Sequence, residues 1–143
     1  MKLTSFALAC SLLAATSSTA YAQATDSPNS EASPRWRAGL TRTDLARQDV
    51  SKTGYELIQS RVDFAPGVAS PRHSHPGEEV AFVLEGTLEY QLAGRAPVIL
   101  TAGSALVIPA GTPHIARNVG DGKASELATY FVRKDQPLVK VEH

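Results

Sequence analysis

The sequence predicts an all-β fold, either a sandwich or a barrel, and three observations support this class. Segments rich in strand-forming residues follow one another from "YELIQSRVDF" (55–64) onward. Turn signals recur about every 8 to 12 residues, a spacing typical of small β domains. Helical periodicity is missing outside the N-terminal segment, except for a possible short helix at "RTDLARQD" (42–49).

The individual strands can be expected from their boundaries. The first, 55–64, is stopped by "APG", and "EEVAFVLEGTLEYQLAG" (78–94) contains two strands divided at Gly86. Further strands are expected within the segments 97–103, 104–111, 114–120 and 124–132. The prolines of "PAGTP" (109–113) would disrupt a central strand, so this segment is predicted to be a loop at the rim of the barrel.

The N-terminal residues have the pattern of a secretory signal peptide. Lys2 precedes an apolar run, and "AYA" (20–22) provides small residues for cleavage after Ala22. The apolar run is shorter than the roughly 20 residues that span a bilayer, so no membrane anchor is expected after cleavage. We therefore expect a signal peptide at 1–22, a flexible linker at 23–35 and one domain at 36–143. The protein is then exported, to the periplasm or outside the cell.

Composition narrows the chemistry further. Cys10 is the single cysteine and lies within the predicted signal peptide, so the exported protein would have neither disulfides nor thiolate ligands. Any metal must then be bound by nitrogen and oxygen atoms. The chain has 14 basic and 14 acidic residues with no basic cluster, which argues against nucleic-acid binding.

The segment "PRHSHPGEE" (71–79) contains the strongest candidate metal ligands. Residues two apart on a strand point to one face, so His73 and His75 face the same way. If the chain stays extended, Glu79 joins that face and Glu78 points away. Two imidazoles and one carboxylate suit a first-row divalent metal. By itself, a pair of nearby histidines is more often a surface or core feature than a metal site.

Two longer patterns resemble the conserved motifs of the cupin superfamily. The fixed positions of the first motif are Gly67, His73, His75, Glu79 and Gly86. The fixed positions of the second are Gly103, Pro109, Ala110, Gly111, His114 and Asn118. Together they span 67–118, and every fixed position of both motifs agrees.

This resemblance implies a specific fold and a specific site. The fold is the double-stranded β-helix, a jelly-roll barrel of six to eight strands. The implied metal ligands are His73, His75, Glu79 and His114, while Asn118 has a structural role. The metal would be one divalent ion of iron, manganese, nickel, copper or zinc. The fourth histidine, His143, is the last residue and is expected to be solvated.

The expected open side of the metal is lined by alternate strand residues such as Ala81, Val83 and Tyr90. Tyr90 is a candidate for a hydroxyl group near the ligands, although filling the core is its commoner role. By strand parity, Arg72 and Arg117 point outward.

Two functions follow from the resemblance. One is a metal-dependent enzyme, similar to dioxygenases or lyases, acting on a small oxygenated molecule. The alternative is a cupin that binds a metal or small ligand without turnover, because no acid–base partner beyond the metal is evident in the sequence. Single-domain cupins commonly pair, so a homodimer is expected, with the stretch 36–50 as a candidate exchanged edge.

Overall fold

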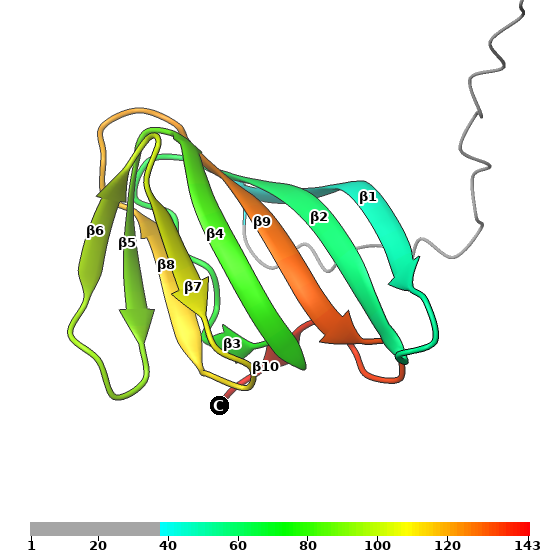
Figure 1. The fold of residues 1–143 in the computed structure, drawn as a ribbon. Coiled ribbons are helices and arrows are strands. Elements are labelled where there is room, and N and C mark those ends of the chain that lie inside the picture. The colour runs from blue at the N-terminus through cyan, green and yellow to red at the C-terminus, as the bar shows by residue number, and fades with distance from the viewer. Residues whose placement is uncertain (1–37) are drawn as a thin grey trace, which may run out of the picture. The chain divides into compact units, whose positions relative to one another are not determined.

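The computed structural model describes residues 38–143, which form two antiparallel sheets of five strands each. The first sheet has the order β1-β2-β9-β4-β7, with strands at Leu40–Val50, Tyr55–Phe64, Ala124–Arg133, Gly77–Glu85 and Ala105–Ile108. The second has the order β10-β3-β8-β5-β6, with strands at Lys140–Val141, His73–Ser74, His114–Asn118, Thr87–Leu92 and Val98–Thr101. Figure 1 shows the long strands β2, β9 and β4 side by side in the first sheet.

The all-β, jelly-roll prediction is confirmed. The strand expected at 55–64 is β2, and the division at Gly86 separates β4 from β5. The strand number differs from expectation, since the described residues contain ten strands instead of six to eight. Two of the ten, β3 and β10, are only two residues long and pair with each other.

The possible helix at 42–49 is wrong, because these residues belong to β1. β1 pairs with β2 along its whole length, with an irregularity between Asp44 and Ala46. A short helix there would leave the backbone groups of β2 at that edge without partners, so pairing overrides the weak local preference. The predicted signal peptide (1–22) and linker (23–35) lie outside the described residues. Within residues 38–143, no helix has the length and apolar character needed to cross a membrane.

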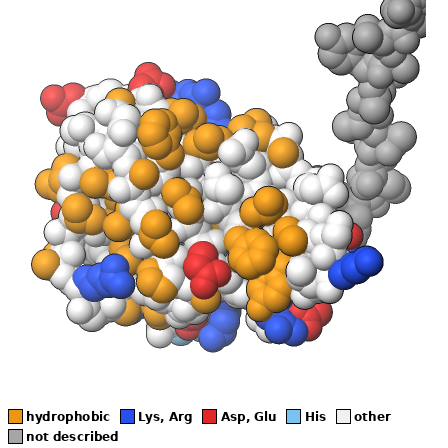
Figure 2. Space-filling view, in the orientation of Figure 1, with side chains coloured by type: hydrophobic (Ala, Val, Ile, Leu, Met, Phe, Trp, Pro, Cys, Tyr) orange, Lys and Arg blue, Asp and Glu red, His pale blue; other side chains and the backbone are white. Residues whose placement is uncertain are grey.

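The core lies between the two sheets and is made by alternate strand residues. In β4, Ala81 and Val83 are fully buried, while Val80, Phe82 and Leu84 lie on the opposite face and are partly exposed. Figure 2 shows hydrophobic side chains spread over the face of the molecule that carries β4. β4 is therefore apolar on both faces, a pattern typical of strands that are covered on both sides.

Two glycines allow close contacts between strands. Gly86 has φ 77°, a left-handed conformation that glycine adopts without strain, and a Cβ atom there would lie 2.6 Å from the carbonyl oxygen of Lys123. Gly77 begins β4 between His75 and Glu79. A Cβ atom on Gly77 would lie 2.0 Å from the carbonyl oxygen of Phe131 in β9. The approach of β4 to β9 at this point therefore requires glycine.

We predict that Gly77→Ala destabilises the protein by about 1–3 kcal/mol or more, because the methyl group meets backbone that can move only if the strands separate. Denaturant unfolding monitored by circular dichroism measures the change. Gly122→Ala is the matched control, since a Cβ atom there has no neighbour within 4 Å, and its effect should stay within about 0.5 kcal/mol. Equal stabilities of the two variants would contradict the prediction.

Candidate metal centre

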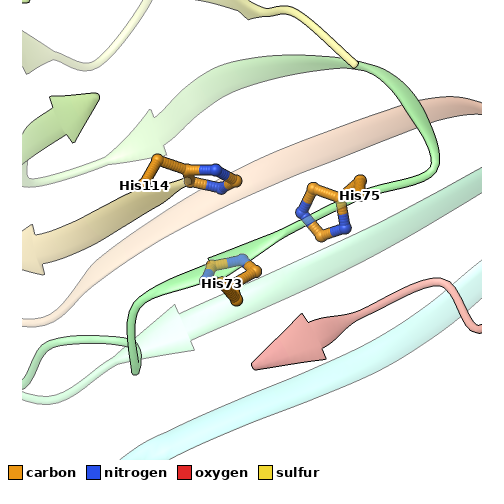
Figure 3. A group of neighbouring side chains, drawn as sticks. All are labelled: His73, His75 and His114. Carbon is orange, nitrogen blue, oxygen red and sulfur yellow. The ribbon is translucent and has the colours of Figure 1, made fainter. Parts of the chain in front are cut away.

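The three histidines of the two motifs lie together in the interior. His73 belongs to β3, His75 follows that strand, and His114 begins β8. His73 and His114 are direct partners in the pairing of β3 with β8. One ring nitrogen of each histidine lies within 4.8 Å of the others, and all three residues are buried. Figure 3 shows the three rings around a shared space. These residues could therefore hold one metal ion.

A backbone carbonyl oxygen orients each ring through its Nδ1 atom. The three contacts are His73 to Pro71 (2.9 Å), His114 to Thr112 (2.9 Å) and His75 to Leu138 (2.7 Å). A carbonyl oxygen can only accept, so Nδ1 carries the proton in each neutral ring. The remaining nitrogen, Nε2, then has a lone pair available to a metal.

Glu79 approaches this cluster from the other sheet. Its Oε2 atom lies 3.0 Å from Nε2 of His75 and 3.4 Å from Nε2 of His114. Nε2 of His75 and Oε2 of Glu79 are both buried and neither has a hydrogen-bond partner. Two lone-pair acceptors at this distance repel each other unless a proton or a cation lies between them. The donor set of nitrogen and oxygen atoms fits a first-row divalent metal.

The protonation of the cluster agrees with this fit. Burial, reinforced by the neighbouring His114 and His75 rings, lowers the pKa of His73 to about 4, so its ring is neutral at pH 7. Burial alone would raise the pKa of Glu79, but His114 and His75 outweigh it and lower that pKa to about 2. Glu79 is therefore a carboxylate at neutral pH.

The neighbouring residues lie as strand parity predicts. Glu78 is exposed on the outer face of β4, whereas Glu79 is 3% exposed and faces the histidines. Arg72 and Arg117 are exposed. The loop of the second motif packs against the first, since the backbone N–H of Gly111 donates to the carbonyl oxygen of His75 (2.9 Å).

Asn118 has the structural role expected for it. Its side-chain amide donates to the carbonyl oxygens of Phe64 (3.1 Å) and Gly122 (2.8 Å), and its Oδ1 accepts from the backbone N–H of Gly120 (3.0 Å). The side chain is buried, and because these hydrogen bonds use both of its polar atoms, it is not a candidate metal ligand.

A cavity opens beside the cluster, with an empty volume of about 570 Å³ including its mouth. The residues that line it are Leu40, Arg42, Val62, Phe64, Ser70, His73, Glu79, Tyr90, His114, Ala116, Glu126 and Tyr130.

Tyr90 and Glu126 form a buried pair on the cavity wall. The Tyr90 hydroxyl donates a hydrogen bond to Oε2 of Glu126. Burial and the nearby Glu79 carboxylate raise the pKa of Glu126 to about 8, although the bond from Tyr90 lowers it, so Glu126 is largely the neutral acid at pH 7. Tyr90 is thus buried as expected and also holds a polar group in the cavity.

Glu126 was not among the residues predicted from the sequence, although the sequence contains a signal for it. In "ASELATYFV" (124–132), Glu126 shares strand parity with the buried residues Ala124, Ala128 and Tyr130. A carboxylate at an inward position is costly without a partner or a function. Strand parity on this segment could therefore have identified it.

Comparisons with known proteins agree with this architecture. The cupin domain family model matches residues 60–130. A cupin superfamily protein from Desulfitobacterium hafniense has a TM-score of 0.56 at 19% identity, over 66% of this chain and 79% of that one. An oxalate oxidase structure with the substrate analogue glycolate has a TM-score of 0.59 at 29% identity, over 87% of this chain and 61% of that one.

Among curated proteins, germin-like protein 1-1 of Oryza sativa subsp. japonica is 40% identical over 79 residues, covering 52% of this chain. The match covers 37% of that protein, so the chain spans well under half the length of this relative. The match to the domain family, the two-sheet fold and the placement of both motifs lead to one conclusion: the chain belongs to the cupin superfamily.

Proposed function

We propose that this cupin is a metal-dependent enzyme, dioxygenase- or lyase-like, that acts on a small oxygenated molecule. The observation that carries the proposal is the buried contact between Nε2 of His75 and Oε2 of Glu79, which requires a cation or a proton, at the wall of an open cavity. In this proposal His73, His75, Glu79 and His114 are the metal ligands. Iron, manganese, nickel, copper and zinc all suit these ligands.

A bound divalent metal would act as a Lewis acid that polarises an oxygen atom of the substrate. Residues that line the cavity would supply the other chemical groups. Glu126 holds a proton at neutral pH, and Tyr90 fixes the orientation of its carboxyl group. A buried acid of this kind can donate a proton or hydrogen bond to a bound molecule. This group was not identified from the sequence, and its presence favours the enzyme over the non-catalytic alternative.

The similarity to oxalate oxidase suggests the first substrates to test. That structure contains glycolate as a substrate analogue, at 29% identity to this chain. Oxalate, glycolate and small keto acids are therefore the leading candidates, followed by enols and flavonols. Export follows from the signal-like residues 1–22 and remains part of the proposal.

We predict that His114→Ala lowers metal affinity at least about 100-fold while the fold persists, because one of the clustered nitrogens is lost. Glu79→Gln should weaken binding about 10- to 100-fold by removing the negative charge next to the ion. Zinc titration calorimetry and elemental analysis measure both effects. The matched controls are His143→Ala and Glu78→Gln, two exposed positions away from the cluster.

Full metal retention by His114→Ala would contradict the proposed site. If Glu79→Gln and Glu78→Gln lower the metal affinity equally, Glu79 is not a metal ligand, and the three histidines alone remain as the proposed ligands.

The enzyme proposal predicts turnover by protein loaded in turn with each of the five metals. Oxygen uptake and product formation from oxalate, glycolate, keto acids, enols and flavonols measure it, with Glu126→Gln expected to lower kcat at least tenfold because the acidic proton is lost. Full metal binding with no turnover over the panel would favour the alternative, a cupin that binds a metal or small ligand without catalysis.

We also propose a homodimer. The structure favours the outer face of the first sheet as its interface over the stretch 36–50. β1 already pairs with β2 of the same chain, which reduces the case for strand exchange. The outer face of the first sheet carries Val80, Phe82, Leu84, Val107 and Phe131, each more than a third exposed. The inner face of β4 is buried in the core, and its outer face is apolar but exposed. Such an outer face is expected to be covered by a second copy of the chain.

We predict that Phe82→Glu shifts the protein from dimer to monomer, because a charge at the centre of this face opposes its burial. Light scattering after size exclusion measures the mass. Thr101→Glu on β6 is the control, because Thr101 is an exposed strand position on the other sheet. A monomeric wild-type protein would exclude the homodimer.

A further inference from the structure

The cavity extends past the histidines to Arg42 in β1. Arg42 is paired with Val62 of β2, which in turn is paired with Glu126 of β9. Direct partners on neighbouring strands point to the same face, so Arg42 and Glu126 share the inner face two strands apart. At the usual strand spacing this separates their backbones by about 10 Å. Both side chains line the cavity together with His73 and His114.

The guanidinium of Arg42 is held along one edge. Its Nε and Nη2 atoms donate to Oδ1 of Asp44 at 2.9 and 2.8 Å, and Nε also lies 3.3 Å from the hydroxyl oxygen of Ser60. The Ser60 hydroxyl donates to the same Asp44 oxygen at 2.8 Å. Arg42 is therefore oriented by two neighbours and has little freedom to leave the cavity wall.

The other edge of the guanidinium is unused. An arginine has five N–H donors in a planar fork, and Nη1 of Arg42 makes no hydrogen bond or ion pair within residues 38–143. The side chain is only 15% exposed, so a partner at this edge would meet a partly desolvated charge. Such a fork matches the two oxygens of a carboxylate.

A purely structural ion pair explains these contacts less well. Arg42 and Asp44 lie two residues apart on β1 and face the same way, but the Asp44 side chain is about half exposed, whereas Arg42 is only 15% exposed and lines the cavity. Two carboxyl groups, Glu79 and Glu126, also line it, and among the described lining residues Arg42 is the one lysine or arginine. A cation at this place can attract an anionic ligand that the Glu79 carboxylate would otherwise disfavour.

We propose that Arg42 binds the carboxylate of a small hydroxy or oxo acid whose second oxygen group reaches the histidine cluster. This inference rests on the proposed metal-dependent function and names its substrate class. Asp44 and Ser60 hold the guanidinium in place, and the acid form of Glu126 stands beside the ligand. A neutral molecule of the same size would lack the charge that Arg42 recognises.

Calorimetry and NMR titration with glycolate and its neutral analogue glycolamide test the proposal, on full-length chain with and without zinc. Arg42→Gln should raise the glycolate Kd about tenfold or more and leave glycolamide binding unchanged, because charge-assisted bonds to the carboxylate are lost. Arg42→Lys keeps the charge without the fork and should give an intermediate loss. Arg47→Gln is the matched control, since Arg47 lies on the same strand and pairs with Glu56 outside the cavity.

The outcomes separate this inference from the proposed function. Zinc binding with unchanged glycolate affinity in folded Arg42→Gln overturns the role of Arg42 and leaves the metal site standing. Arg42-dependent glycolate binding without any zinc uptake overturns the metal-dependent function and supports Arg42. Equal losses in Arg42→Gln and Arg47→Gln, equal binding of glycolamide and glycolate, or no glycolate binding by zinc-loaded wild type would each overturn the inference.

Discussion

The site depends on one recurring interaction, the hydrogen bond from Nδ1 of each buried histidine to a backbone carbonyl oxygen. These bonds fix the tautomer of His73, His75 and His114 and turn every Nε2 lone pair toward a common space. The same orientation creates the conflict with Glu79, because an acceptor nitrogen then lies 3.0 Å from a carboxylate oxygen. The interior is stable with that contact only when something positive lies between the two atoms.

The strand framework makes these contacts possible by bringing distant segments to one place. His73 and His114 are opposed across β3 and β8, and Glu79 comes from the facing sheet. The carbonyl oxygen that orients His75 belongs to Leu138, in the segment just before β10. Gly77, where β4 comes close to β9, lies between His75 and Glu79 in the sequence. The packing of β4 against β9 therefore also affects the positions of these two side chains.

Outside the cluster, the cavity has polar groups with distinct roles. Glu126, which accepts a hydrogen bond from Tyr90, places a neutral acid on the inner face of the first sheet, and Arg42 presents a charged fork on the same face. A neutral acid and a cation near a histidine cluster that could hold a metal complement a small oxygen-rich anion better than an apolar ligand. The acid, the guanidinium and the histidines together distinguish this cavity from an apolar packing defect in the core.

The sequence by itself determined the positions of the strands after residue 55 other than β3 and β10, the three histidines of the site and the distinction between Glu78 and Glu79. The strand positions follow from turn residues and strand alternation, whereas the grouping of His114 with His73 and His75 follows from the resemblance of the two motifs to those of the cupins. Only the tertiary structure decided that 42–49 is a strand, that Leu138 orients His75 and that Arg42 and Glu126 line one cavity. Each of these depends on pairing between segments far apart in the chain, where neighbouring strands supply the partners that local sequence patterns cannot specify.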